Sequence, residues 1–261
     1  MKIIFIFQCR VNRYGKCLLC YPAFAELTVL AVDTSANVAS AALAEDGRLI
    51  CESILNHKKT HSEKIMPMID EILRDSEIDI SDIDLFAAAN GPGSFTGLRI
   101  GVSTVKALAH ATGKPTVGVS TLEGLAYNLF GADGIVSPIM DARRAQVYNA
   151  VYRWENGALV EIKAPRAIAL DECLAEFDDE KKVYFPGDAA AVYKQQIYEK
   201  MGDRAVFVPF TACLQRASSI AAIAQIKAER GELETYHTLM PFYLRKSQAE
   251  REYESRKENN K

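Results

Sequence analysis

Two aspartates in this sequence stand where a nucleotide-handling site would need them. Asp33 follows an apolar β-type run and opens the stretch Asp-Thr-Ser-Ala, and Asp141 follows a second such run and opens Asp-Ala-Arg-Arg. At such strand ends an aspartate can hold metal or orient water, and a nearby glycine lets the backbone approach phosphate. Neither loop has a glycine two residues after its aspartate, so efficient phosphoryl transfer is not expected. Asp33, Thr34, Ser35 and Asp141 are candidates for weak nucleotide binding; alternatively, both aspartates only end their strands.

A glycine-rich turn, Gly-Pro-Gly-Ser-Phe-Thr-Gly at residues 91–97, precedes a predicted helix. Backbone amides at a helix N-terminus can bind an anion, which makes Gly91 and Gly93 candidates for phosphate contact. No Lys-Ser/Thr pair follows, so the turn is not a Walker A loop. The alternative is a strand-to-helix turn that needs glycine dihedral angles and uses Ser94 as its N-cap.

Candidate metal ligands are few. His57 and His61 are four residues apart, but Thr60 is typical of a helix N-cap, so His57 precedes the helix and no carboxylate completes a set. Cys17 and Cys20 form a C-x-x-C motif with Cys9 nearby, which leaves a metal knuckle or a redox pair as a hypothesis. No second pair with zinc-ribbon spacing follows it.

The composition is that of an ordinary globular protein. The 261 residues carry a formal net charge of −3, which lacks the basic excess of a dedicated nucleic-acid binder. If the protein works on a nucleic acid, a partner is expected to supply most of the contact surface. No apolar run approaches the roughly 20 residues that span a bilayer, and Ile3–Phe7 is too short for a secretory signal. We therefore expect a cytoplasmic protein with no membrane contact.

The pattern of elements repeats. Strands are predicted at 28–32, 38–44, 48–54, 85–89 and 116–119, with helices at 61–74, 95–112 and 121–130. A second set has strands at 135–140, 146–153, 158–162, 182–185 and 205–208, with helices near 170–177, 188–200 and 217–229. Each half thus gives three strands, helix, strand, helix, strand, helix.

This order predicts an α/β protein with a duplicated actin/Hsp70/sugar-kinase-like (ASKHA) fold in two lobes. We expect an N-terminal lobe at 27–133 and a C-terminal lobe at 134–245 whose last helix packs back on the first lobe. Residues 1–26 form an unassigned N-terminal extension, and residues 246–261 form a charged tail.

Five segments carry a family resemblance: residues 30–35, 60–63, 90–101, 140–144 and 241–245. Together they make the chain from Leu30 to about Arg245 similar to the TsaB family, the partner subunits of the bacterial threonylcarbamoyladenosine complex. The long glycine segment is the most specific of the five. Residues 1–26 have no counterpart in this resemblance and are either an added arm or the product of an upstream start-site misassignment, which we favour.

The resemblance implies a scaffold role with no required cofactor. A TsaD-type catalytic subunit transfers the threonylcarbamoyl group to adenosine beside the tRNA anticodon, a TsaE-type ATPase joins the complex, and tRNA is met only through that complex. The catalytic relative carries an H-x-x-x-H metal motif where this sequence has Thr121 and Leu125, so no metal is expected here. The alternative is an ATPase or sugar-kinase-like enzyme, or a metallopeptidase, of the same superfamily.

The resemblance also places the partner-binding surface on the helices at 61–74 and 95–112. Without the partner, the same surface is expected to form a symmetric homodimer. The first helix has more apolar residues than one buried stripe needs, so some are expected to face outward. The interface residues predicted on this basis are Ile65, Met66, Ile69, Leu73, Val102 and Val105.

Overall fold

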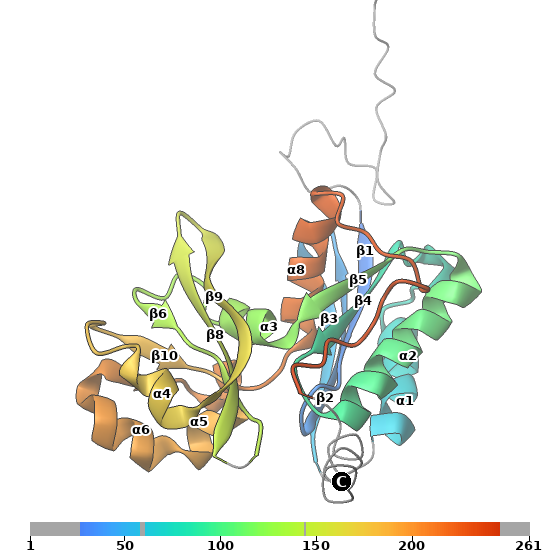
Figure 1. Ribbon diagram of the computed structural model, residues 1–261. Helices are drawn as coiled ribbons and strands as arrows, with labels where there is room; N and C mark the ends of the chain where they lie inside the picture. The colour runs from blue at the N-terminus through green and yellow to red at the C-terminus, as the bar shows by residue number, and fades with distance from the viewer. Residues whose placement is uncertain (1–26, 58–60, 144, 246–261) are drawn as a thin grey trace, which may run out of the picture.

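The computed structural model describes residues 27–57, 61–143 and 145–245, which form two lobes, each built on one β-sheet (Figure 1). The first lobe contains, in order, β1 (Thr28–Asp33), β2 (Val38–Glu45), β3 (Arg48–Asn56), α1 (His61–Asp75), the 3-10 helix η2 (Ile80–Asp82), β4 (Leu85–Gly91), α2 (Phe95–Thr112), β5 (Thr116–Ser120) and α3 (Thr121–Tyr127). The second part of the chain contains β6 (Ile135–Val136), β7 (Ile139–Asp141), β8 (Gln146–Glu155), β9 (Ala158–Ala169), α4 (Leu170–Ala175), β10 (Val183–Phe185), α5 (Asp188–Val192), α6 (Lys194–Met201), the 3-10 helix η3 (Gly202–Arg204), β11 (Ala205–Phe207), α7 (Phe210–Cys213) and α8 (Ala217–Glu229).

The two sheets have the same topology. In the first, the order is β3-β2-β1-β4-β5; β2 is antiparallel to both β3 and β1, and β1, β4 and β5 run parallel to one another. In the second, β9 and β8 pair antiparallel, β6 and β7 pair with β8, and β10 and β11 continue in parallel from β6. Strand order and direction therefore recur, and the predicted duplicated ASKHA fold is confirmed.

The first sheet is covered on both faces, which explains why β1 is apolar along its whole length. Leu30 and Val32 face a core shared with α1 and α2, and Val29 and Ala31 face a second core shared with α8. Because successive side chains of a strand point to opposite faces, a strand between two helical layers needs no polar side. In Figure 1, α8 lies against this first sheet although it follows the second lobe in the chain.

The α1 and α2 helices bury four of the six residues predicted to meet a partner. Ile65, Ile69, Val102 and Val105 are at most 2% exposed and belong to the core beneath α1 and α2. The prediction that these four side chains form a partner-facing surface is therefore wrong. The inward stripe of α1 consists of Ile65, Met68, Ile69 and Ile72. Of the predicted interface residues, Met66 is 45% exposed and Leu73 is half-buried, so only these two have side chains that another molecule can reach.

The second lobe departs from the sequence prediction at three places. Ser137-Pro138 divides the predicted first strand into β6 and β7, since proline cannot donate a ladder hydrogen bond. The strand predicted to end at 162 runs on to Ala169 as β9, and it pairs with β8 across two register shifts. The single helix predicted at 188–200 is interrupted at Tyr193 and forms α5 and α6.

The described residues bear on membrane contact and on cysteine chemistry. None of their helices is long and apolar enough to cross a membrane. Their cysteines, Cys51, Cys173 and Cys213, are all free. The C-x-x-C at Cys17 and Cys20, the Thr60 cap and the charged tail lie outside the described residues.

The burial of Ile69 makes a sharp prediction. We expect Ile69→Glu to lower the free energy of unfolding by more than about 3 kcal/mol, because an unpaired carboxylate would enter an apolar core. Met66→Glu on the exposed side of the same helix should stay within about 0.5 kcal/mol of the parent. Urea unfolding followed by circular dichroism measures both. A folded Ile69→Glu protein with an unchanged midpoint would show that this side chain is not core.

Candidate functional site

The first loop that could handle a nucleotide is buried. Asp33 ends β1 and is 1% exposed, and its Oδ1 accepts hydrogen bonds from the Ser35 amide at 2.8 Å and from Ser35 Oγ at 2.6 Å. Thr34 and Ser35 are equally buried. Burial raises the pKa of the Asp33 carboxyl, while the two hydrogen bonds from Ser35 and the nearby His61 oppose that rise. All three predicted residues thus lie within the first lobe and not on its surface.

The glycine-rich segment packs directly on this loop. A Cβ atom at Gly93 would overlap the carbonyl oxygen of Ser35, and one at Gly97 would overlap the carbonyl oxygen of Thr34. At Gly101, one turn further along α2, a Cβ would meet the Thr34 hydroxyl. The glycines are therefore required because α2 approaches the backbone of the loop so closely that no side chain fits between them.

Hydrogen bonds complete this contact and use the polar groups of the turn. The Ser94 amide donates to the Ser35 carbonyl at 2.6 Å, and Thr34 Oγ1 donates to the Gly97 carbonyl at 2.7 Å. Ser94 is also the N-cap of α2, because its hydroxyl accepts from the Gly97 amide. Two amides that could have cradled an anion are thus satisfied within the chain, which favours the interpretation of a structural turn.

A C-terminal strap, defined here as residues 232–245, closes the segment from the other side. Glu234 exchanges two backbone hydrogen bonds with Thr116 of β5, and Leu239 is fully buried in the core beneath α2. The Phe242 amide donates to the Asn90 carbonyl at 2.6 Å, and a Cβ at Gly91 would overlap the Phe242 carbonyl oxygen. Figure 1 shows the strap in red, crossing the strands of the first sheet beside α2.

The second loop differs from the first because it is exposed. Asp141 ends β7, its amide donates to Asp188 Oδ1 at 3.2 Å, and its own Oδ1 accepts from the Arg143 amide at 2.7 Å. Burial raises the pKa of the neighbouring Asp188. Arg245 of the strap donates from Nη1 to the Ala142 carbonyl at 2.5 Å, so the strap connects the first lobe to this loop of the second.

The donor set at the positions of the relative's metal motif does not fit a metal ion. Thr121 and Leu125 lie on α3 and are both buried, and Leu125 packs in a core that α3 shares with β7 and β8. Leucine has no ligand atom and threonine is a poor ligand. In residues 27–57, 61–143 and 145–245, no group of three or more His, Cys, Asp or Glu side chains could hold a metal.

The two candidate histidines do not form a pair. His57 is exposed after β3, and the His61 Nε2 lies 2.7 Å from the Ala36 carbonyl. That contact ties the start of α1 to the loop that follows β1, which is a structural role.

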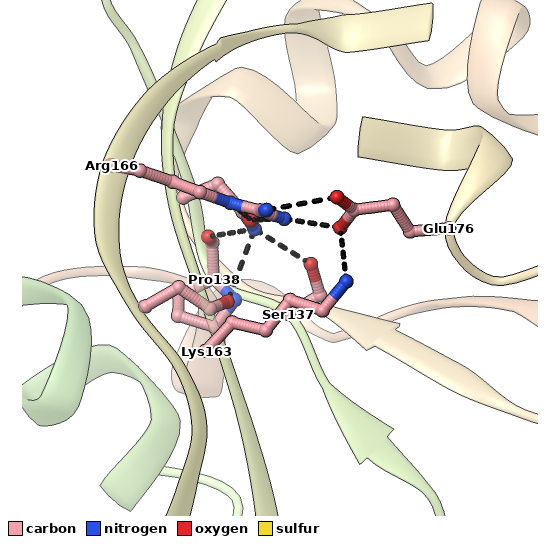
Figure 2. Close-up of polar contacts among 7 residues, drawn as sticks. Ser137, Pro138, Lys163, Arg166 and Glu176 are labelled. Carbon is pink, nitrogen blue, oxygen red and sulfur yellow. Dashed lines mark hydrogen bonds and ion pairs between the residues drawn. The ribbon is translucent and has the colours of Figure 1, made fainter. Parts of the chain in front are cut away.

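Sequence reasoning missed a polar network in the second lobe (Figure 2). Arg166 of β9 donates to Asn149 Oδ1 at 3.0 and 3.2 Å and forms an ion pair with Glu176, which also lies 3.0 Å from Lys163 Nζ. The fully buried Asn149 donates to Ser137 Oγ at 2.9 Å and to the Pro138 carbonyl at 3.2 Å. The hydrogen bond and charge of Arg166 lower the pKa of Glu176. This polar network braces β8, β9 and the end of α4 against one another. Its residues are spaced irregularly over 137–176, so no sequence motif marked it.

Comparisons with known proteins agree on one family. The family model described as TsaD, tRNA N6-adenosine threonylcarbamoyltransferase, matches residues 48–253. The tRNA threonylcarbamoyladenosine biosynthesis protein TsaB of Bacillus subtilis is 36% identical over 225 residues, which is 86% of this chain and 96% of that protein. TsaB of Escherichia coli is 39% identical over 134 residues, which is 50% of this chain and 58% of that protein.

Among solved structures, the fold is similar to that of an uncharacterized Pseudomonas aeruginosa protein with similarity to peptidase YeaZ. The TM-score is 0.73 at 29% identity, covering 84% of this chain and 100% of that one. This likeness extends across both lobes.

The close approach at Gly97 reverses the usual effect of an alanine in a helix. Gly→Ala inside a helix ordinarily stabilises by about 0.5–1 kcal/mol, but here the new methyl would overlap the Thr34 carbonyl. We expect Gly97→Ala to destabilise by at least about 1 kcal/mol. Ser103→Ala, on the exposed side of α2, should change stability by less than about 0.5 kcal/mol. Stabilisation of Gly97→Ala in thermal or urea unfolding would contradict the packing described here.

The buried Asp33 predicts a pH dependence. Because burial raises its pKa in the folded state, the charged form is disfavoured there, and stability falls as pH rises above the usual carboxyl value of 3.8. Asn keeps an oxygen that can accept both hydrogen bonds from Ser35. Asp33→Asn should therefore be more stable than the parent at pH 7, with the difference shrinking as the pH approaches 4. Urea unfolding at several pH values measures the difference in stability between Asp33→Asn and the parent. A smaller gain in stability at pH 7 than at pH 4 would refute the prediction.

Proposed function

Because the chain belongs to the TsaB family of tRNA threonylcarbamoyladenosine biosynthesis proteins, we propose that it is the non-catalytic partner of a TsaD-type transferase. In this proposal the TsaD-type subunit transfers the threonylcarbamoyl group to the adenosine beside the tRNA anticodon. A TsaE-type ATPase joins the pair, and the present chain shapes the complex without performing the chemistry.

The observation that carries the proposal is the chemistry of α3. The two positions of the catalytic relative's metal motif are Thr121 and Leu125 here, and both side chains are enclosed in protein. A metal at this point would need different ligands and a different packing of α3 against β8. The enzyme alternatives, a kinase-like ATPase or a metallopeptidase, have less support because the glycine segment is filled by the chain's own backbone.

The outer surface of α1 and α2 offers a place for the partner. Three small residues of α2, Ser103, Ala107 and Ala111, are exposed at spacings of four, so a second helix could approach α2 closely. Met66 of α1 is exposed, and Leu73 is half-buried at the edge of the core. We call these five residues the α1–α2 face.

Charge on α1 bears on which partner this face prefers. Its exposed carboxylates are Glu63, Asp70, Glu71 and Asp75, and only Asp70 and Asp75 lie within 4 Å of a cation, Arg74, in the described residues. A partner with a basic surface would complement them, whereas a second copy of this chain would bring like charges together. We therefore propose that the homodimer formed through this face is weaker than the complex with the TsaD-type subunit. Added salt should strengthen the homodimer, by screening repulsion, and weaken the complex, by screening attraction.

The α1–α2 face can be tested with one exposed alanine. Ala107→Arg should weaken binding to the TsaD-type subunit by at least about tenfold and abolish self-association, since a long charged side chain would separate the helices. The variant should unfold at the same temperature as the parent because Ala107 is exposed. Size-exclusion chromatography with light scattering, with and without the TsaD-type subunit, measures both associations.

The matched control is Ala191→Arg, which places the same side chain at an exposed position of α5 in the second lobe. It should bind as the parent does. If both variants bind the TsaD-type subunit as tightly as the parent, or if both bind it equally weakly, the α1–α2 face is not the docking surface.

A further inference from the structure

An exposed stack of arginine and aromatic side chains lies where the strap crosses the start of α2. The Phe95 and Tyr243 rings are stacked with centroids 4.6 Å apart, and the Arg99 guanidinium lies 3.9 Å from the Phe95 centroid. Arg99 Nε also donates to the Tyr243 hydroxyl at 3.2 Å. Tyr243 nevertheless stays 38% exposed and Arg99 is exposed, so the stack leaves ring and guanidinium surface open to solvent.

The strap leads from this stack to two more arginines. Arg245, two residues after Tyr243, contacts the Ala142 carbonyl, and two residues of chain span at most about 7 Å. Arg143, next to Ala142, is exposed with a left-handed backbone at φ 62°. We call Phe95, Arg99, Arg143, Tyr243 and Arg245 the arginine–aromatic patch.

The charge of the patch is opposite to that of the chain. It holds three arginines, with Asp141 and Asp188 as neighbouring acids, in a protein whose formal net charge is −3. In the part of the chain that the structure describes, the Arg143 side chain has no acceptor, and Arg99 uses only its Nε. Folding therefore leaves guanidinium donors unused at this point, beside planar rings.

This combination matches the chemistry of single-stranded RNA. Unpaired bases stack on aromatic and guanidinium planes, and arginine forks bind the phosphates between them. A duplex hides its base faces and would contact only the charges. We propose that the arginine–aromatic patch binds a single-stranded segment of RNA, with one base stacked on Tyr243 or Arg99 and phosphate held by Arg143 and Arg245.

The proposal goes beyond the scaffold function, in which RNA is met only through the partner. The patch borders the α1–α2 face, because Arg99 precedes Ser103 by one helical turn, but the residues varied in the test, Tyr243 and Arg143, lie on the strap and in the second lobe, outside that face. Failure of one proposal therefore does not entail failure of the other. A variant of the patch should still bind the TsaD-type subunit.

The test uses the full chain and a fluorescein-labelled, single-stranded RNA of about 12 nucleotides, followed by anisotropy at about 50 mM salt. Its perfect duplex serves as the second probe. We expect the single strand to bind more tightly than the duplex. Tyr243→Ala should weaken binding to the single strand by about tenfold, and Tyr243→Phe, which keeps the ring, should stay within about twofold.

Arg143→Ala provides an arm that does not depend on packing, because that side chain is exposed and without a partner in the described residues. It should lower the slope of log affinity against log salt by about one. Tyr198→Ala, at a tyrosine on α6 that is 55% exposed against 38% for Tyr243, is the control and should bind as the parent does.

The proposal would be overturned by no binding of the single strand by the parent, by equal binding of strand and duplex, or by unchanged binding of both Tyr243→Ala and Arg143→Ala. Loss of the TsaD-type subunit from folded Tyr243→Ala protein would reassign the patch to protein docking, and would also overturn it.

Discussion

The architecture depends on one contact between two backbones: the start of α2 lying on the loop that follows β1. Gly93 and Gly97 allow the contact, and hydrogen bonds between Ser94 and Ser35 and between Thr34 and Gly97 hold it. From the other side, the strap uses Gly91 in the same way. Because three segments remote in sequence meet without intervening side chains, the position of α2 is determined to within the width of a methyl group. The α1–α2 face and the arginine–aromatic patch both take their positions from it.

The same contact occupies the turn at which this fold could hold a phosphate. In this chain the turn that might cradle phosphate is occupied by the carbonyl groups of Thr34, Ser35 and Phe242. The aspartate of the first loop is enclosed, whereas Asp141, its equivalent in the second lobe, is at the surface. Pseudo-symmetry is thus kept in the strand order and lost in the loops. What the surface offers in exchange is a close-packing helical face with acidic surroundings and, at the end of the strap, a small basic area with aromatic rings.

Much of the fold could be predicted because it follows from local patterns. The repeated order of strands and helices and the Ser94 cap each depend on neighbouring residues alone. The predicted interface failed at Ile65, Ile69, Val102 and Val105 because a helical stripe shows which residues share a face but not which face meets the sheet. The continuation of β9 past Pro165 depends on its pairing with the start of β8, where Ala169 lies opposite Gln146. The packing role of Gly91, Gly93 and Gly97 could not be predicted either. The groups that they contact lie about 60 residues upstream, at Thr34 and Ser35, and about 150 residues downstream, at Phe242.

In our proposal, this chain enables the transferase reaction through binding and has no catalytic group of its own. Mass spectrometry of threonylcarbamoyladenosine formed on unmodified tRNA tests it most directly, with the threonylcarbamoyl donor and the TsaE-type ATPase supplied in every reaction. The account predicts no product with this chain in place of the TsaD-type subunit, and product when both are present. Turnover by this chain without the TsaD-type subunit, or full turnover by the TsaD-type subunit without this chain, would contradict it.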